Sequence, residues 1–360
     1  MDKTLKYGVI GCGGIANAKH LPSLKKIPGV ETVAFCDIVR ERAEKANREY
    51  GGGRGKVFGS WRELLEEDLD AVCVLTPNNT HAEISIAALR AGKHVMCEKP
   101  MAKTYREALD MLSARDAAGK LLTIGYQNRF RPDSLFLKAE CKKGTLGEIY
   151  FARAVALRHR AVPTWGVFLD GEKQGGGPLI DIGTHSLDLA LFMMNNYEPL
   201  YAAGTVYHKL NKDRNTGNVW GDWDTKKFTV EDSAFGFIVM KNGATIMLQS
   251  SWALNTAEVR EGVVSICGVK GGADMPRQGE LVINGVKNNR QYTLIPSLKA
   301  GGVDFYGGSN ESESDLEARC FAKAIRGRGE LCVRPEEAAA VTMILEGIYR
   351  SAGTGKPYFF

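Results

Sequence analysis

Short apolar runs alternate with longer stretches of mixed polarity from residue 7 to residue 127. Most of these runs are apolar throughout, which is typical of parallel strands covered on both faces. Connections of helical length between such strands favour right-handed crossovers and a doubly wound sheet. Strands are predicted at 7–11, 30–37, 70–77, 93–100 and 121–127, helices at 14–27, 39–50, 79–91 and 104–118, and a glycine-rich turn at 51–55.

After residue 127 the pattern changes to strand-like runs joined by short turns. Turns such as KNGA (241–244) and INGV (283–286) predict a sheet that is mainly antiparallel. A glycine-rich loop at 171–178 precedes a predicted helix over 179–195. Further helices are predicted at 133–143, 312–326 and 335–352, and strands at 147–160, 200–208, 232–241, 244–254, 258–268, 279–285 and 290–296.

These patterns predict an α/β protein of two domains, since 360 residues are enough for two. Residues 1–126 are expected to form an N-terminal Rossmann domain with a doubly wound parallel sheet. Residues 127–360 are expected to form a C-terminal α+β domain with a large, mainly antiparallel open sheet. The prediction allows the C-terminal helix to pack back on the first domain.

Composition and charge narrow the range of functions. Hydrophobic residues make up 44% and charged residues 25%, as in folded rather than disordered chains. The net charge of +5 comes without a dense run of lysine and arginine, so we expect no nucleic-acid partner. No apolar run approaches the roughly 20 residues that span a bilayer. The first residues lack a basic segment followed by a long apolar one, so we expect neither membrane attachment nor a secretory signal.

The eight cysteines are scattered along the chain, and no C-x-x-C pair occurs. Four of them lie in or beside predicted apolar strands. This pattern favours reduced cysteines in a cytoplasmic protein over a disulfide framework or a zinc site. We therefore expect no metal.

The first predicted strand runs into a glycine motif, G-x-G-x-x-A. Gly11 would permit a tight turn, Gly13 would let the backbone approach a pyrophosphate, and Ala16 would let the helix pack closely on the strand. Gly14 and Ile15 belong to the same turn, where the unpaired N–H groups of a helix N-terminus favour anions. The alternative interpretation is a purely structural glycine turn.

The second predicted strand ends at Asp37, about 20 residues beyond the glycine motif. A carboxylate in this place accepts hydrogen bonds from a ribose 2′-hydroxyl and repels a 2′-phosphate, which favours NAD over NADP. Arg40 and Arg42 lie close enough to accommodate a phosphate, so NADP stays open as the less favoured cofactor. Asp37 could equally be a simple helix cap.

Polar residues also follow the next two strands. Thr76, Pro77 and Asn78 would line the crevice at the carboxyl ends of the strands, where ligands bind in sheets of this kind. The alternative is that Asn79 or Thr80 only caps the following helix.

The apolar run His94–Cys97 ends abruptly in Glu98, Lys99 and Pro100, two opposite charges and a ring without an N–H donor. On its own this is a structural ion pair at a strand end. At the carboxyl edge of a parallel sheet, Lys99 would reach into the cofactor crevice.

A second charged cluster lies in the predicted helix 179–195. Asp181 and His185 are four residues apart, so they share one helix face. A carboxylate beside an imidazole forms a base whose tautomer and pKa are set by its neighbour. The alternative is a helix N-cap at Asp181 and a surface histidine.

Tryptophans and arginines of the second domain are candidates for substrate contact. Trp220 and Trp223 lie in a polar loop, where aromatic faces could stack on sugar rings. For each tryptophan the alternative is core packing. The other candidates are Arg129, Arg158, His159, Trp165 and Trp252.

Taken together, these motifs resemble the GFO/IDH/MocA family, the type of glucose–fructose oxidoreductase and inositol dehydrogenase. The resemblance covers nearly the whole chain and depends on the order and spacing of motifs that are individually weak. It implies NAD(P) on the first domain, a sugar or polyol on the open sheet of the second, and a homo-oligomer. The motifs are G-x-G-x-x-A at 11–16, T-P-N…H at 76–81, E-K-P at 98–100, G-x-x-x-R-F at 125–130 and G-G-G-x-x-x-D-I-G-x-H at 175–185.

The resemblance also implies residue roles. The family reaction oxidises a secondary alcohol, with His185 as base, Asp181 holding the imidazole or the substrate hydroxyl, and Lys99 stabilising alkoxide character. Pro100, after a bond that could be cis, would fix the lysine. The predicted cofactor contacts are Gly11, Gly13, Gly14, Ile15, Asp37, Arg42, Thr76, Pro77, Asn78, His81, Glu98, Lys99 and Gln127, and the predicted substrate contacts are Lys99, Arg129, Arg158, Trp165, Asp181, His185 and Trp252.

The expected activity is therefore NAD-dependent oxidation of a secondary hydroxyl of a sugar or glycoside, for which the ring 3-hydroxyl is one possible position. Three alternatives stay open: an inositol or free-sugar dehydrogenase, an NAD-dependent glycosidase that recycles its cofactor, and an NAD(P)-binding sensor without turnover.

Overall fold

The computed structural model describes residues 3–213, 216–257, 259–298 and 311–360. The chain divides into two compact units, which are described separately below. The first contains Met1–Gln127 and Glu311–Ala339, and the second contains Asn128–Asn310 and Ala340–Phe360. The predicted boundary at residues 126 and 127 lies beside the first junction. The segment that returns to the first unit contains α9 (Glu313–Ile325).

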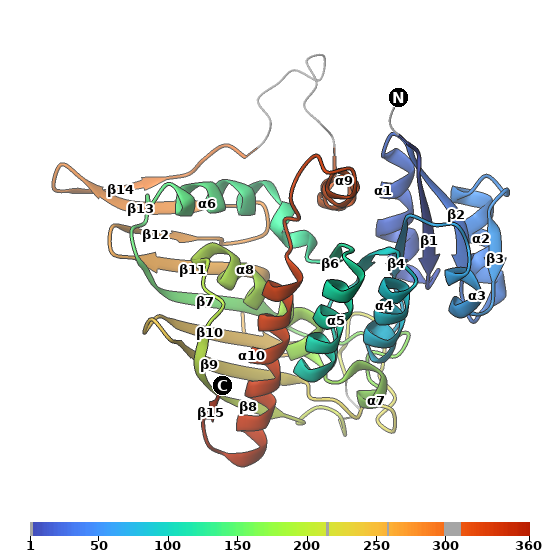
Figure 1. Cartoon of the computed structure of the whole chain (residues 1–360). Helices are drawn as coiled ribbons and strands as arrows, with labels where there is room; N and C mark the ends of the chain where they lie inside the picture. Colours follow the sequence, from blue (N-terminus) through green and yellow to red (C-terminus); the bar gives the residue numbers. More distant parts are fainter. Residues whose placement is uncertain (1–2, 214–215, 258, 299–310) are drawn as a thin grey trace. The chain divides into compact units, whose positions relative to one another are not determined.

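The first unit contains a six-stranded parallel sheet in the order β3-β2-β1-β4-β5-β6 (Figure 1). This is the predicted doubly wound arrangement, and its strand order reverses between β1 and β4, where such sheets bind nucleotides. β4 and most of β1 and β5 are buried, which explains their continuous apolar runs. The strands are β1 (Leu5–Ile10), β2 (Val30–Cys36), β3 (Lys56–Phe58), β4 (Ala71–Val74), β5 (His94–Cys97) and β6 (Leu122–Ile124).

Right-handed crossovers place α1 and α2 on one face of this sheet and α4 and α5 on the other. α5 begins with a capping box in which Thr104 and Glu107 each satisfy a backbone N–H of the other. The helices and helical turns are η1 (Ala16–His20), α1 (Leu21–Lys26), α2 (Arg40–Tyr50), α3 (Trp61–Leu65), η2 (Asn78–Thr80), α4 (His81–Arg90), α5 (Tyr105–Ala118) and η3 (Gln127–Phe130).

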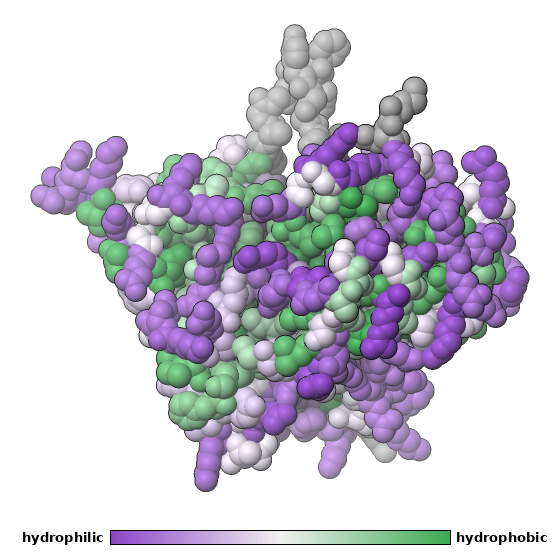
Figure 2. Space-filling model, in the orientation of Figure 1, coloured by the Kyte–Doolittle hydropathy of each residue, from purple (hydrophilic) through white to green (hydrophobic). Residues whose placement is uncertain are grey.

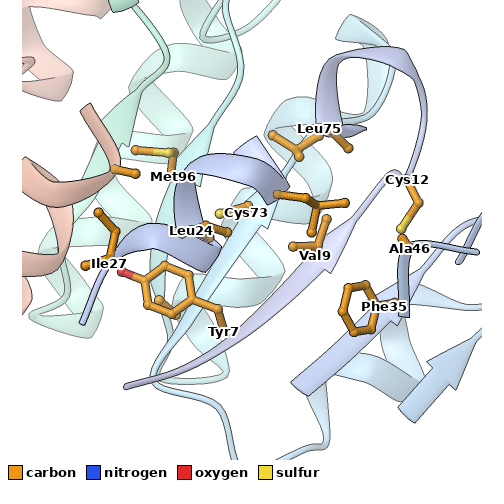
Figure 3. Close-up of a cluster of buried hydrophobic side chains, with 14 of the residues drawn as sticks. Tyr7, Val9, Cys12, Leu24, Ile27, Phe35, Ala46, Cys73, Leu75 and Met96 are labelled. Carbon is orange, nitrogen blue, oxygen red and sulfur yellow. The ribbon is translucent and has the colours of Figure 1, made fainter. Parts of the chain in front are cut away.

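The core of the first unit explains why α9 returns to it. Tyr7, Val9, Phe35 and Cys73 are buried in one cluster with residues of α1 (Figure 3). Phe321 of α9 belongs to the same cluster, and its ring meets that of Tyr7 edge-on at a centroid distance of 6.3 Å. The apolar face of α9 therefore completes the core of the nucleotide-type unit.

The second unit is built on a nine-stranded sheet in the order β14-β13-β12-β11-β7-β10-β9-β8-β15. Its pairings are antiparallel except that β10 lies parallel to β7, so the prediction of a mainly antiparallel sheet is confirmed. Residue 258, the first of one predicted strand, lies outside the described residues. The strands are β7 (Ile149–Leu157), β8 (Pro199–Tyr207), β9 (Ser233–Met240), β10 (Thr245–Ser251), β11 (Arg260–Gly268), β12 (Gly271–Asp274), β13 (Val282–Lys287), β14 (Arg290–Leu294) and β15 (Tyr358–Phe359).

One face of this sheet is covered by helices. α8 packs against β7 and β11, and Ser186 Oγ of α8 donates to Val155 O of β7 at 2.7 Å. The opposite face carries exposed apolar side chains, including Phe237 and Met247. Figure 2 shows the helix-covered side of this unit, on which hydrophobic residues gather toward the β8–β15 end. The remaining helices and helical turns are α6 (Pro132–Lys142), α7 (Gly171–Gln174), η4 (Leu179–Gly183), α8 (Thr184–Met194) and α10 (Pro335–Thr354).

Candidate active site

The glycine turn of the first unit has the geometry that anion binding requires. Gly11 has a φ of 93°, and a Cβ added to it would lie 2.5 Å from the carbonyl oxygen of Leu75, so only glycine fits. A Cβ added to Gly13 or Gly14 would meet no heavy atom within 4 Å. The helix that follows begins without a side-chain cap. Open space in front of an uncapped helix N-terminus suits a pyrophosphate.

Asp37 lies at the carboxyl end of β2 and faces this turn. Its Oδ2 accepts from the backbone N–H of Cys12 and its Oδ1 from that of Val39, each at 2.8 Å. The carboxylate is thus held against the glycine turn, and each oxygen has a second acceptor position for a ribose hydroxyl. Arg42 is exposed on α2, and Arg40 pairs with Glu44 at 3.0 Å. The residues of this edge therefore fit NAD.

His81 connects two of the predicted cofactor loops. Its Nδ1 lies 2.7 Å from Pro100 O and its Nε2 lies 2.8 Å from Thr76 O. The side chain is buried, and burial lowers its pKa despite these two carbonyl oxygens. This geometry makes His81 a link between the T-P-N and E-K-P segments.

Thr76, Pro77 and Asn78 form the T-P-N segment, one of the two segments that His81 connects. The hydroxyl of Thr80 lies 2.8 Å from both Thr76 Oγ1 and Pro77 O, which closes the turn before α4. Thr76 and Asn78 are half-buried and Pro77 is exposed at the carboxyl edge of the sheet. They lie at the carboxyl ends of the strands, and their contact with a cofactor stays a prediction.

Glu98 is buried and fully engaged by protein groups. Its Oε1 lies 3.0 Å from Lys19 Nζ and 2.8 Å from His20 Nε2, and its Oε2 accepts from the backbone N–H of Lys99 at 3.0 Å. Burial alone would raise the pKa of Glu98, but Lys19 and His20 outweigh burial and hold it well below its usual range. A Cβ on Gly125 would lie 3.1 Å from Oε1, so this neighbour has to be small.

Lys19 extends the network behind Glu98 to α9. Its ammonium also lies 3.0 Å from Glu317 Oε2 and donates to Gln127 Oε1 at 3.2 Å. Burial opposes the charge of Lys19, yet Glu317 and Glu98 raise its pKa above the ordinary value. Burial raises the pKa of Glu317, and Lys19 offsets part of that effect. Sequence reasoning missed Lys19, His20 and Glu317, because nothing local to them indicates a buried pairing.

Lys99 itself is half-buried, at the end of β5 and beside these loops. The peptide bond between Lys99 and Pro100 is cis. The loops of the predicted cofactor contacts and the predicted catalytic lysine thus share the carboxyl edge of one sheet in the first unit.

Asp181 and His185 belong to the second unit. Asp181 lies in the π-helical turn η4 and His185 in the first turn of α8, so they occupy successive turns of one continuous helix. Asp181 Oδ2 accepts from the indole Nε1 of Trp252 at 3.0 Å. The carboxylate is therefore oriented by a buried side chain, and it does not act as the helix N-cap.

Glu231, which sequence reasoning also missed, holds the start of this turn. Its carboxylate accepts from the backbone N–H groups of Gly177 and Leu179 at 2.8 and 3.2 Å, and from the hydroxyl of Tyr349 at 2.8 Å. A Cβ on Gly177 would lie 2.2 Å from Glu231 O. The glycines of the G-G-G-x-x-x-D-I-G-x-H motif are thus needed for close packing.

Two predicted substrate residues are instead buried supports. Arg129 donates from Nε and Nη2 to both carboxylate oxygens of Asp188 at 2.9 and 2.6 Å, and both side chains are 0% exposed. Its guanidinium also lies 4.5 Å from the ring centre of Phe192. Trp252 is likewise 0% exposed. Neither side chain therefore presents a surface to a ligand.

The remaining candidates lie near the polar loop. Arg158 pairs with both carboxylate oxygens of Glu261 at 2.6 and 2.7 Å and lies 5.2 Å from the ring centre of Trp220. Trp165 and Trp220 are 52% and 42% exposed, whereas Trp223 is buried. Core packing thus accounts for Trp223 and Trp252, and not for Trp165 or Trp220.

The described residues contain neither a membrane-spanning helix nor a cluster of metal ligands. No helix among them is both long enough and apolar enough to cross a membrane. No group of three or more His, Cys, Asp or Glu side chains among them is arranged to hold a metal ion.

Comparison with known proteins identifies the family of the chain. Residues 5–126 match an oxidoreductase family with an NAD-binding Rossmann fold, and residues 135–274 match the GFO/IDH/MocA C-terminal domain. D-glucoside 3-dehydrogenase of Escherichia coli (strain K12) is 34% identical over 98% of this chain and 96% of that protein. Glucose-6-phosphate 3-dehydrogenase of Bacillus subtilis (strain 168) is 30% identical over 68% of this chain and 67% of that protein.

A solved structure of levoglucosan dehydrogenase in complex with NADH and levoglucosan shares the fold, with a TM-score of 0.82 at 23% identity over 98% of each chain. The predicted fold and the predicted resemblance are both confirmed. The chain belongs to the GFO/IDH/MocA family of oxidoreductases, and its first domain is the NAD-binding Rossmann domain of that family.

Proposed function

We propose that this oxidoreductase oxidises the ring 3-hydroxyl of a glycoside with NAD. The observation that carries the chemistry is the pairing of Asp181 with the buried indole of Trp252, one helical turn before His185. A fixed carboxylate beside an imidazole is suited to removing a hydroxyl proton. The substrate class follows the full-length relative named D-glucoside 3-dehydrogenase.

In this mechanism His185 takes the hydroxyl proton, because the ordinary pKa of imidazole is close to neutral pH. Asp181, oriented by Trp252, orients the imidazole or the substrate hydroxyl. The ammonium of Lys99 stabilises the negative charge that develops on the reacting oxygen. When bound, NAD would supply the acceptor for the hydride of the carbinol carbon. The glycine turn, Asp37 and the Thr76–Asn78 loop would hold it, and Gln127 remains a predicted contact.

We also propose that the protein is a homo-oligomer and that it is located in the cytoplasm. Exposed apolar side chains on the open sheet, among them Phe237 and Met247, support a homo-oligomer that covers them. All eight cysteines are thiols, and four of them are buried, which suits a reducing, cytoplasmic location. Size-exclusion chromatography with light scattering tests the assembly, and a monomer at micromolar concentration would contradict it.

A substrate panel tests the proposed activity. The purified protein is incubated with NAD or NADP and with methyl glucosides, free sugars or inositols, and the reduced cofactor and all sugar products are measured. The proposal expects reduction with NAD and a glucoside, with the glycosidic bond intact. Preference for inositol or free sugar, glycoside cleavage without net reduction, or tight cofactor binding without turnover would each favour one of the alternatives and contradict this one.

A further inference from the structure

A cavity of about 870 Å³ lies in the second unit, and its lining includes none of the residues assigned to catalysis. One wall is the segment Thr164–Lys173, which includes the start of α7, and the other is the loop Asp222–Thr229. α7 is the short helix at the lower right of Figure 1.

The two walls are fixed to each other by hydrogen bonds. Thr164 Oγ1 donates to Trp220 O at 2.7 Å, beside the second wall. Between the two walls, Gly171 N donates to Thr229 Oγ1 and Thr229 N donates to Leu169 O, both at 2.9 Å. The cavity is therefore preformed, which lowers the entropic cost of binding a ligand.

An exposed indole lines this cavity. Trp165 is 52% exposed, and its ring is held edge-on by Trp220 and Phe168 at centroid distances of 4.9 and 5.9 Å. The packing fixes the indole while much of its surface stays open to solvent. A pyranose presents an apolar face of C–H groups that fits such a surface.

The polar part of the lining suits a neutral, hydroxyl-rich ligand. Four carboxylates and two ammonium groups line the cavity, so its charge is negative and disfavours anions. Carboxylates accept hydrogen bonds from sugar hydroxyls. A flat aromatic group would use the indole but not these acceptors. The charged lining residues are Asp170, Glu172, Lys173, Asp222, Asp224 and Lys227.

The cavity is structurally connected to the proposed catalytic carboxylate. Leu169, in the cavity wall, belongs to the buried cluster that contains Trp252. Trp252 in turn donates to Asp181 Oδ2. One packed cluster therefore supports both the cavity and Asp181.

We propose that this cavity binds the second, neutral sugar ring of a disaccharide, stacked on Trp165, while the ring to be oxidised is held by the site of Asp181 and His185. This inference rests on the proposed function, because it names the remote part of the same glycoside. It predicts that a neutral glucosyl disaccharide is a better substrate than a methyl glucoside.

The test compares Trp165→Ala and Trp165→Phe with Trp61→Ala, which removes a tryptophan of the first unit. Saturation-transfer NMR without cofactor measures binding of methyl glucoside and of cellobiose or maltose, whichever the wild type binds more tightly. Steady-state assays measure kcat/KM for the same pair. We expect Trp165→Ala to lose about tenfold in affinity and in kcat/KM for the disaccharide, and less than about threefold for methyl glucoside. Trp165→Phe should restore most of the difference, and Trp61→Ala should match the wild type.

Absence of disaccharide binding, or equal losses for both ligands in Trp165→Ala, would overturn the subsite. The binding arm separates the two proposals. If no glycoside is oxidised but Trp165→Ala still weakens disaccharide binding selectively, the proposed function fails and the subsite stands. Circular dichroism confirms the fold of each variant.

Discussion

The ammonium of Lys19 lies 3.0 Å from Oε1 of Glu98, and both side chains are buried. The other oxygen of Glu98 accepts from the backbone N–H of Lys99. The ion pair thus fixes the chain at the residue proposed to stabilise the reacting oxygen. This supports a positioning role for Glu98, and its contact with the cofactor stays a prediction.

Removal of Lys19 should therefore destabilise the first unit. Lys19→Met leaves Glu98 and Glu317 without the cation they share, and breaking a buried ion pair costs about 3–5 kcal/mol. Urea denaturation followed by circular dichroism measures the free energy of unfolding. Lys25→Met, on the exposed side of α1, is the matched control and should change it by less than about 0.5 kcal/mol. Equal effects of the two substitutions would show that the ion pair of Lys19 contributes nothing to the free energy of unfolding.

Trp252→Phe should lower activity more than stability. It keeps an aromatic ring in the buried cluster but removes the donor to Asp181, and a hydrogen bond to a charged group contributes about 1.5–3 kcal/mol. We expect kcat to fall about tenfold or more, with KM for NAD unchanged. The control is Trp223→Phe in the same cluster, whose indole donates to Asp213 O. If both variants lost the same activity, packing and not orientation of Asp181 would be the cause.

Acid should weaken the attachment of α9 through Asp315. Burial alone would raise the pKa of Asp315, but hydrogen bonds from Lys26, Ser23 and Ser312 lower it to about 2. Since the folded pKa lies below the ordinary value of 3.8, this carboxylate stabilises the fold above that value. The contribution, at most about 2 kcal/mol, is lost as the pH falls toward 2.

The check is urea denaturation of the wild type and Asp315→Asn at pH 5 and pH 3. The advantage of the wild type over the variant should shrink by about 1 kcal/mol at the lower pH. An advantage that is the same at both pH values would refute this assignment.

His185→Ala and Lys99→Met test the proposed chemistry. Loss of a general base reduces rates by about 10²–10⁴, and loss of the ammonium removes stabilisation of developing charge. We expect kcat to fall at least about 100-fold in each variant, while NAD affinity measured by calorimetry changes little in His185→Ala. Near-normal turnover in both variants would show that other residues perform these steps.

Local motifs predicted the glycine turn after the first strand, because its constraints are local. The turn at Gly11 requires a positive φ and a close backbone approach, and both are encoded by one glycine. Most other strands and helices could also be predicted, because their apolar patterns are local. β3 and α3 were missed since three and five residues are too short for a periodic signal.

Contacts between residues far apart in the sequence determine which of the candidate side chains are buried, and the sequence left this open. Arg129 and Arg158 were equal candidates for substrate contact in the sequence. In the structure Arg129 forms a fully buried ion pair with Asp188, whereas Arg158 is partly exposed beside Trp220. The same holds for the buried Trp252 and the exposed Trp165. Whether a charge or ring is buried depends on partners from distant segments, which no local pattern specifies.

The most direct test of the central claim is the fate of the hydrogen on C3 of the sugar. Methyl glucoside deuterated at C3, or at C2 as the control, is incubated with the protein and NAD, and the reduced nicotinamide is examined by mass spectrometry. The account predicts deuterium in the nicotinamide product from the C3-labelled glucoside alone. Transfer from C2, or reduction of NAD without deuterium from C3, would contradict it.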